Sequence, residues 1–390
     1  MKQNKKPIKI AIISPIFPNK KNPVSGIFVR QQSKYIAREG HDVTILTTGT
    51  KDDKKEEIID GVPVYRLSNT NLSPVKSLFF SLKCIKMINY LNKKSRVDVI
   101  IQNFVGISTI IIGIASKIQK KKFVVISHGT SWELPKDNFF KNAIIRLALS
   151  VPDVVVCVSR KTAELLSQNT NQKKLIVINN GIDPETLNPT ISNAFLRKKL
   201  GLGNKIVLLS VCNLVQKKGI DAIINALAKA LKTNSNLEYI IIGDGPEKNN
   251  LMELSKKLGM EGHIRFLGVK TGDELSNYYN LCDIFIMMSR DINNEIESFG
   301  IAYIEASYFG KPVIAGKSGG TEDAVVNNKT GFIVNSEDEE RLIRKIKLLA
   351  GSKKLRNKLG NAGRSRVVKG FFWKHNVENL ISELSKLKTR

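Results

Sequence analysis

Short apolar runs alternate with longer amphipathic stretches along the whole chain. The runs contain β-branched and aromatic residues in nearly unbroken order, which is typical of strands buried on both faces of a parallel sheet. Strands that alternate with helices predict an α/β fold in which crossover helices cover the sheets. The predicted strands are 8–14, 42–48, 97–103, 122–128, 153–159 and 175–181, followed by 205–211, 237–243, 263–269, 283–289, 312–316 and 331–335.

The alternation breaks once, at 179–193, where NNGIDPETLNPTISN has the Asn, Pro and Thr content of a linker. A chain of 390 residues is also too long for one ordinary core. We therefore predict two Rossmann-like, doubly wound domains at 1–188 and 189–370, with a closing helix at 371–390. The carboxyl edges of two such sheets can face one another across a cleft, where a ligand is expected.

The net charge of +27, from 62 basic and 35 acidic residues, changes the range of expected partners. Such a field attracts nucleic acid, anionic lipid or phosphorylated substrates, and lysine scattered over a solvated surface explains it equally well. The stretch 73–96 is more specific, because bulky apolar residues recur there at helical spacing, as in a helix lying on an anionic membrane. Its basic residues are Lys76, Lys83, Lys86, Lys93, Lys94 and Arg96.

The apolar runs are far shorter than the roughly 20 residues that cross a bilayer. We expect a cytoplasmic protein, with peripheral attachment at the inner face of the membrane as the role of 73–96. Cysteines 84, 157, 212 and 282 lie far apart without metal-ligand spacing, which favours buried free thiols. No D-x-D motif occurs either, so we expect no metal and no cofactor.

The densest group of candidate site residues lies in ESFGIAYIEA, residues 297–306. If Gly300 opens a helix, the backbone N–H groups of Phe299, Gly300 and Ile301 form an anion site between Glu297 and Glu305. Carboxylates beside a phosphate are useful where they accept hydrogen bonds from hydroxyls, and a nucleotide sugar offers both groups. The alternative is two ordinary helix carboxylates, one favouring the helix dipole and one solvated.

Two further segments follow predicted strands. Lys217, Lys218 and Gly219 begin a helix where a lysine can neutralise a diphosphate leaving group, although such a pair often faces solvent. His128 ends a strand and can bind a sugar hydroxyl or assist proton transfer, with a satisfied core histidine as the alternative.

Two glycine-containing turns complete the set of candidates. Gly26 lies in a loop before a helix, where backbone can approach a phosphate, or is simply a turn glycine. GDGPE at 243–247 is a strand-to-helix turn with Pro246 as the first helical residue.

These segments together resemble the group 4 retaining glycosyltransferase family with the GT-B fold, over nearly the whole chain. Glu297 and Glu305 match that family's E-x7-E signature. The segments NGID, KKG, GDGPE and RFLG before this signature and SGG after it occur in the family's usual order. The opening PVSGIFVRQQ is similar to members that build cell-envelope polysaccharides, including teichuronic-acid-type enzymes.

The resemblance implies a role for each matching residue. Glu305 would hold ribose hydroxyls, Glu297 the transferred sugar and Lys218 the diphosphate, with backbone at Gly26 and at 299–301 assisting. His128 would contact the sugar near the acceptor, and backbone from Phe266 to Gly268 would meet the base. Asn213 replaces the family's frequent arginine, so Lys217 is a candidate for the missing diphosphate contact.

The resulting hypothesis is a metal-independent transfer of a hexose-type sugar from a nucleotide diphosphate sugar to a glycan or lipid-linked acceptor. A nucleotide-sugar epimerase or hydrolase of similar fold also needs a diphosphate site. A basic nucleic-acid-binding protein is the alternative from another class. The 7% aromatic content and the lack of a recognised motif make nucleic acid an unexpected partner.

Overall fold

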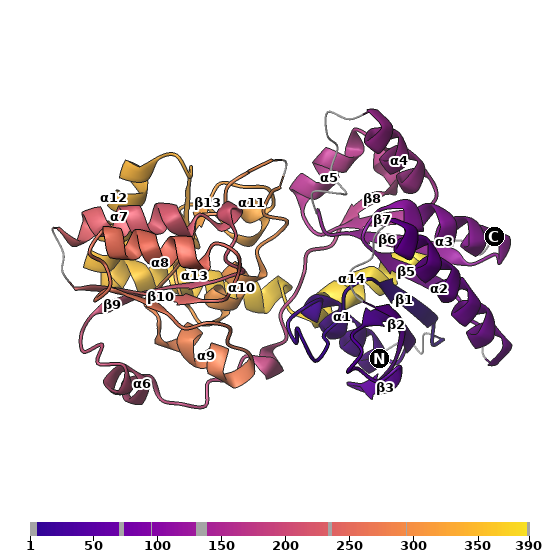
Figure 1. Cartoon of the computed structure of the whole chain (residues 1–390), viewed down its shortest axis with the longest axis horizontal. Helices are drawn as coiled ribbons and strands as arrows, with labels where there is room; N and C mark the ends of the chain where they lie inside the picture. Colours follow the sequence, from indigo (N-terminus) through magenta and orange to yellow (C-terminus); the bar gives the residue numbers. More distant parts are fainter. Residues whose placement is uncertain are drawn as a thin grey trace. The chain divides into compact units, whose positions relative to one another are not determined.

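The computed structural model describes residues 6–69, 74–94, 96–129, 139–232, 236–293 and 295–387. It divides into two compact units, each with its own sheet (Figure 1). The first unit comprises Met1–Gly181 with Trp373–Arg390, and the second comprises Ile182–Phe372. The chain therefore enters the second unit a little before residue 189 and returns to the first at its end.

The first sheet has eight strands in the order β3-β4-β2-β1-β5-β6-β7-β8, and all neighbours are parallel except β3 and β4. Its six predicted strands are confirmed. The sequence prediction missed the β3–β4 hairpin, whose turn residues Asp60 and Gly61 have φ angles of 52° and 78°, as a tight hairpin requires. The strands are β1 Lys9–Ser14, β2 Asp42–Gly49, β3 Glu56–Ile59, β4 Val62–Asn69, β5 Val99–Asn103, β6 Lys122–Ser127, β7 Val154–Cys157 and β8 Leu175–Val177.

The helices of the first unit include the C-terminal segment. Helix α14 packs beside α1 (Figure 1), and its buried Trp373 donates a hydrogen bond from Nε1 to Gln31 Oε1 at 2.7 Å. The predicted closing helix is thus part of the N-terminal fold. The helices are α1 Ile27–Arg38, α2 Pro74–Lys94, α3 Ile107–Ile118, α4 Phe139–Ser150, α5 Arg160–Ser167 and α14 Trp373–Lys386, with the short turn η1 Gln172–Lys174.

The second sheet has six parallel strands in the order β11-β10-β9-β12-β13-β14, all at predicted positions. They are β9 Ile206–Val211, β10 Leu237–Ile242, β11 Ile264–Phe266, β12 Ile284–Met287, β13 Val313–Gly316 and β14 Gly331–Val334. The helical elements are η2 Pro184–Thr186, α6 Asn193–Lys199, η3 Gln216–Lys218, α7 Ile220–Leu231, α8 Lys248–Lys257, α9 Gly272–Leu281, α10 Ile301–Tyr308, α11 Thr321–Ala324, α12 Glu339–Gly351 and α13 Lys353–Gly370.

Both faces of the second sheet are buried, as its continuous apolar strands require. One face packs Leu208, Ile241 and Ile286 against α7, α8 and α12. On the other face, the ring of Phe285 lies 5.9 Å from those of Tyr279 in α9 and Tyr303 in α10. In Figure 1, α7 and α8 accordingly lie on one side of β9 and β10, and α9 lies on the other.

Each sheet has a point at which the strand order reverses. In the first sheet β1 lies between β2 and β5, and in the second β9 lies between β10 and β12. Open α/β sheets bind ligands outside the carboxyl ends of the strands at such a point, because the flanking loops run in opposite directions there. The residues after β1, β5, β9 and β12 are therefore the first to consider as site residues.

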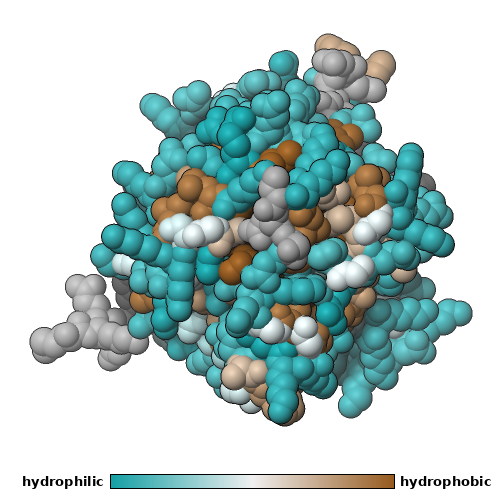
Figure 2. Space-filling model, turned by 90° about the vertical axis from the view of Figure 1, so that its left-hand side faces the viewer, coloured by the Kyte–Doolittle hydropathy of each residue, from teal (hydrophilic) through white to brown (hydrophobic). Residues whose placement is uncertain are grey.

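Figure 2 shows one face of the molecule, on which hydrophilic side chains predominate. The face in Figure 2 shows small hydrophobic patches separated by hydrophilic side chains. Within the described residues, no helix has both the length and the apolarity needed to cross a membrane. All four cysteines are free thiols, as predicted, although Cys212 is only partly buried.

The docking of α14 on the first unit makes a stability prediction. Replacing Trp373, which is 1% exposed, with alanine leaves a large cavity and removes the bond to Gln31. We expect Trp373→Ala to lower the free energy of unfolding of the first unit by about 3–5 kcal/mol, measured by urea denaturation. The neighbouring exposed Lys374→Ala should change it by less than about 0.5 kcal/mol. Equal effects of the two substitutions would contradict this packing.

Candidate active site

Three loops converge at the carboxyl edge of the second sheet. They follow β9, β12 and β13, which are adjacent strands, so their side chains emerge at neighbouring positions. The first loop carries Lys218, the second Glu297 and the third Ser318. This is the edge at which the strand order reverses.

Lys218 and Glu297 form a buried ion pair. Lys218 Nζ lies 2.5 Å from Glu297 Oε2, and the two side chains are 15% and 9% exposed. The sequence prediction treated them as separate ligand contacts, and the structure brings them together. Glu297 lies in the loop before α10, as expected, and its backbone N–H donates to Ser318 Oγ at 2.9 Å.

Each member of this pair is kept in its charged form by the other. Burial tends to raise the pKa of Glu297, but the charge of Lys218 and hydrogen bonds from Lys218 and Ser289 leave that pKa below its usual value. Burial likewise tends to lower the pKa of Lys218, and the Glu297 carboxylate leaves it raised. A cation and an anion therefore stand side by side at neutral pH.

Residues 289–291, in the loop after β12, form hydrogen bonds with all three loops. Ser289 Oγ donates to Glu297 Oε2 at 2.8 Å, and Ser318 Oγ donates to Asp291 Oδ1 at 2.6 Å. The backbone N–H of Arg290 donates to Lys217 O at 2.9 Å, and its guanidinium donates to both carboxylate oxygens of Asp221. Sequence reasoning missed this segment. Its place after a buried strand at the reversal point was the available signal.

Two glycines allow these loops to touch. Gly219 has φ 63°, and a Cβ there would lie 2.0 Å from Met288 O. Gly319 has φ 43°, and a Cβ would lie 2.1 Å from Glu297 O. Both positions need a residue without a side chain, because backbone packs directly against backbone.

Glu305 occupies a different environment from Glu297. It lies on α10, which begins at Ile301 after the N-cap Gly300, and it accepts a 2.6 Å hydrogen bond from Tyr279 OH. Burial raises the pKa of Glu305, and the bond from Tyr279 only partly offsets this effect. A freely solvated helix carboxylate is therefore excluded. The preceding Phe299 is buried and stacks on Phe371, with ring centroids 5.9 Å apart.

The remaining candidates of the second unit lie farther along the same edge. Lys217 is paired with Glu295 at 3.3 Å, while Asn213 is exposed. Phe266 ends the edge strand β11 and is followed by Gly268, whose carbonyl accepts from Gly243 N at 2.8 Å.

The 243–247 turn differs in one detail from its prediction. Helix α8 begins at Lys248 and not at Pro246, because Pro246 and Glu247 complete the turn. Among the described residues no group of three or more His, Cys, Asp or Glu side chains is placed to hold a metal ion.

In the first unit, His128 follows β6 and is 7% exposed. Its Nε2 donates to Asn103 Oδ1 at 2.9 Å, and its ring packs against those of Phe28 and Phe104, with centroids 4.4 and 4.7 Å away. Burial lowers the pKa of His128 to about 3. The imidazole is therefore neutral across the range in which an exposed histidine titrates, so it acts through hydrogen bonds.

Gly26 has a structural explanation that needs no ligand. It is the N-cap of α1 with φ 64°, and a Cβ would lie 2.7 Å from Ile16 O. Because the backbone at Ile16 lies so close, glycine is required here without a phosphate. This agrees with the alternative interpretation of Gly26 as a turn glycine. The N-terminus of α1 remains at the carboxyl edge of the first sheet.

A cavity of about 430 Å³ lies at the reversal point of the first sheet, between the ends of β1 and β5. Ile13, Phe80 and Ile112 give it apolar walls, and Ser77 and Ser108 contribute hydroxyls. The adjoining Gln102 Oε1 and Asn103 Nδ2 have no hydrogen-bond partner within the described part of the chain. Sequence reasoning missed this cavity, because it depends on how α2 and α3 pack.

Solved structures share this arrangement of two sheets. Anabaena HepE in complex with UDP-glucose matches with a TM-score of 0.77 and 20% identity, over 97% of this chain and all of that chain. The fold is therefore GT-B, the two-domain class of glycosyltransferase folds.

Sequence comparisons identify the family. The model of the glycosyl transferases group 1 matches residues 192–366, and that of glycosyltransferase family 4 matches residues 25–186. The chain belongs to this family of glycosyltransferases, as its motifs predicted.

Two mycobacterial relatives carry the same name, GDP-mannose-dependent alpha-(1-6)-phosphatidylinositol monomannoside mannosyltransferase. The Mycobacterium tuberculosis protein is 32% identical over 196 residues, which are 50% of this chain and 51% of that protein. The chain thus spans about half the length of that relative. The Mycolicibacterium smegmatis protein is 28% identical over 70% of this chain and 72% of its own.

The Lys218–Glu297 pair makes a prediction that a double-mutant cycle can test. Lys218→Met or Glu297→Gln alone leaves one buried partner unpaired and should destabilise the second unit by about 3–5 kcal/mol. The double variant should lose less than the sum of the single losses, because no charge is then left alone. Additive losses would mean that the two groups do not interact.

The stability of the wild type and that of Glu297→Gln should depend differently on pH in the acid range. Because the pKa of Glu297 is lowered in the fold, its stabilising contribution is complete above the pKa of the unfolded chain and is lost as pH falls through the folded value. Denaturation curves across this range should show that loss in the wild type and not in Glu297→Gln.

Proposed function

We propose that this protein is a glycosyltransferase that moves a hexose-type sugar from a nucleotide diphosphate sugar to a glycan or lipid-linked acceptor. The observation that carries the proposal is the buried Lys218–Glu297 pair at the reversal point of the second sheet, where Glu297 lies in the loop before α10. A cation and a carboxylate held together can serve a donor that has a diphosphate and a hydroxyl-rich sugar.

In this proposal the bound donor separates the two members of the ion pair, because its diphosphate binds one of them and its sugar binds the other. Lys218 turns to the diphosphate, where the first N–H groups of α10 also point, and Glu297 accepts hydrogen bonds from the sugar. Glu305 holds the ribose hydroxyls, and backbone between Phe266 and Gly268 meets the base. The raised pKa of Glu305 fits a carboxyl that binds neutral hydroxyls and pairs with no cation.

The reaction we propose is a retaining transfer. The bond from the anomeric carbon to the diphosphate oxygen breaks, and the acceptor hydroxyl forms a new bond on the same face of the sugar. The departing phosphate takes the acceptor's proton, so no strong enzymic base is needed. Lys218 and the N-terminus of α10 stabilise the growing charge on the diphosphate, which a metal would otherwise do.

The first unit supplies the acceptor side in this proposal. His128, neutral and held by Asn103, would orient a hydroxyl near the transferred sugar through a hydrogen bond. The 430 Å³ cavity beside Asn103 has apolar walls and amide groups, which fit the boundary between a polar head group and an apolar chain.

The names of similar proteins support a lipid-linked or envelope acceptor. The mycobacterial relatives are named for GDP-mannose and a phosphatidylinositol mannoside, which is a lipid acceptor, whereas Anabaena HepE, solved with UDP-glucose, supports only the nucleotide-sugar donor. We propose synthesis of a cell-envelope polysaccharide or glycolipid, of which teichuronic-acid-type polymers are one case, at the inner face of the membrane.

Helix α2 is the segment we propose for attachment to the membrane. Leu78, Phe79 and Leu82 are 41%, 59% and 50% exposed, and the exposed Lys83 and Lys86 lie on the same helix. Of the predicted stretch 73–96, residues 73 and 95 lie outside the described part of the chain. Exposed apolar side chains among lysines favour an anionic bilayer surface over water.

Donor turnover tests the function directly. Purified protein, incubated with UDP-, GDP- and ADP-sugars and chelator, should release one nucleoside diphosphate faster when a lipid or glycan acceptor is added. Lys218→Ala and Glu297→Ala should each reduce the rate by about 10²–10³-fold, the loss typical of removing a group that stabilises transition-state charge.

An exposed matched variant, Lys256→Ala, should keep the wild-type rate. Product analysis separates the alternatives, because an epimerase or hydrolase needs no acceptor. Wild-type rates in both site variants would overturn the assignment.

Membrane attachment has its own test. Flotation with vesicles that contain anionic phospholipid should recover the protein at low salt, and recovery should fall as salt rises. Phe79→Ser with Leu82→Ser should reduce recovery several-fold, while Val269→Ser, at an exposed apolar position of the second unit, should not. Equal recovery of all three proteins would exclude α2 as the attachment surface.

A further inference from the structure

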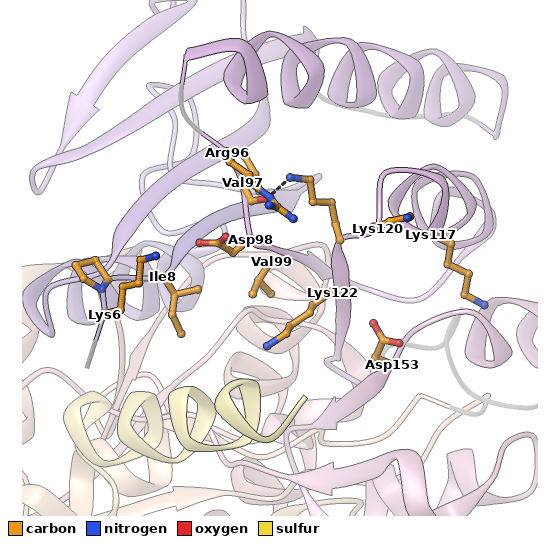
Figure 3. Close-up of a pocket in the computed structure, with 12 residues that line it drawn as sticks. Lys6, Ile8, Arg96, Val97, Asp98, Val99, Lys117, Lys120, Lys122 and Asp153 are labelled. Atoms are coloured by element: carbon orange, nitrogen blue, oxygen red, sulfur yellow. Dashed lines mark hydrogen bonds between the residues drawn. The ribbon is translucent and has the colours of Figure 1, made fainter. Parts of the chain in front are cut away.

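A second concave site lies at the opposite edge of the first sheet, where β1, β5 and β6 begin. This pocket, of about 270 Å³, is shown in Figure 3. The carboxyl edge, with His128 and the proposed acceptor cavity, is at the other ends of the same strands. The proposed transfer reaction therefore does not account for the pocket. Its lining is Lys6, Pro7, Ile8, Arg96, Val97, Asp98, Val99, Lys117, Lys120, Lys121, Lys122 and Asp153.

The pocket is strongly cationic. Six of the lining side chains are basic and two are carboxylates. Both carboxylates have structural partners in the backbone: Asp98 Oδ2 accepts from Lys9 N, and Asp153 Oδ2 accepts from Phe123 N, each at 2.9 Å. No ion pair among the described residues includes Arg96, Lys117 or Lys120. An excess of positive charge therefore faces a small space.

The basic side chains come from separate segments of the chain. Lys117 and Lys120 lie at the C-terminus of α3, where cations favour the helix dipole, so these two alone would need no ligand. That explanation does not extend to Lys6, before β1, or to Arg96, before β5. In Figure 3, Lys6 and Arg96 lie on the side of Asp98, while Lys117 and Lys120 lie on the far side of Lys122, with the amino end of Lys117 directed away from Asp98.

Two of the lysines donate hydrogen bonds to backbone carbonyls. Lys121 Nζ donates to the backbone carbonyl of Val97, and Lys122 Nζ donates to that of Leu384 at 3.3 Å. Burial, together with repulsion from Arg96, lowers the pKa of Lys121. An anion in the pocket would relieve this repulsion and replace carbonyl contacts with stronger charge-assisted bonds.

We propose that this pocket binds a small anion that carries two or more phosphate groups. Several separate cations suit several phosphate charges, and Arg96 can bind one phosphate with two parallel N–H groups. The apolar Ile8, Val97 and Val99 exclude water from one side of the site. A pocket of this size admits a compact ligand, which is either a soluble polyphosphate compound or a phosphorylated lipid head group.

Site-resolved lysine acetylation of the native protein tests this assignment. Limited reaction with acetic anhydride, read peptide by peptide by mass spectrometry, reports the access to each amino group. Inorganic pyrophosphate at millimolar concentration should slow acetylation of Lys117 and Lys120 several-fold and leave exposed Lys256 unchanged. Because the readout is local, pyrophosphate bound near Lys218 cannot produce this signal.

A variant tests whether Arg96 is needed for the protection, and a second ligand distinguishes a soluble compound from a lipid head group. Arg96→Gln is at an exposed position and should abolish the protection, while Arg344→Gln, exposed in the second unit, should retain it. Protection by anionic vesicles but not by pyrophosphate would assign the phosphates to a lipid head group. No protection by either ligand, or equal protection at Lys256, would overturn the proposal, as would protection by a single-stranded oligonucleotide alone.

Discussion

The candidate active site depends on two opposite charges held 2.5 Å apart where water has little access. Burial opposes the charge of Lys218 and that of Glu297, and each charge offsets this effect on the other. Their pairing holds a cation and a carboxylate side by side, and the proposed function assigns these to the diphosphate and the sugar of the donor.

The rest of the second unit is arranged to hold this pair. Ser289 binds the carboxylate, and Arg290 binds the backbone of the loop that carries the lysine, while Ser318 bridges Glu297 and Asp291. Gly219 and Gly319 remove the side chains that would keep these loops apart. The pair therefore depends on direct backbone contact among the loops after β9, β12 and β13, and flexible side chains alone would not hold it.

The polar groups His128 and Glu305, near the carboxyl edges of the first and second sheets, differ from the Lys218–Glu297 pair because burial shifts the pKa of each toward its neutral form. His128 is neutral and packs against two aromatic rings, and Glu305 accepts a hydrogen bond from the hydroxyl of Tyr279. In the proposed reaction such groups would bind hydroxyls by hydrogen bonding, whereas the charged pair would bind the diphosphate and the sugar. The pocket at the opposite edge of the first sheet is different again, because basic side chains line it together with the apolar Ile8, Val97 and Val99. One sheet thus presents two pockets of different chemistry at its two ends.

The sequence by itself determined the class of fold and most of its parts. Strands buried on both faces are continuous apolar runs, so all twelve predicted strands were found, and the E-x7-E spacing placed Glu297 in a loop and Glu305 on a helix. The hairpin of β3 and β4 escaped this reasoning because its first strand is half exposed and lacks such a run. Tertiary structure alone decided that Lys218 pairs with Glu297, that α14 joins the first unit, and that residues from four segments surround the basic pocket. Each of these depends on contacts between residues distant in sequence, whose distances follow from sheet order and helix packing and not from any local pattern of residue types.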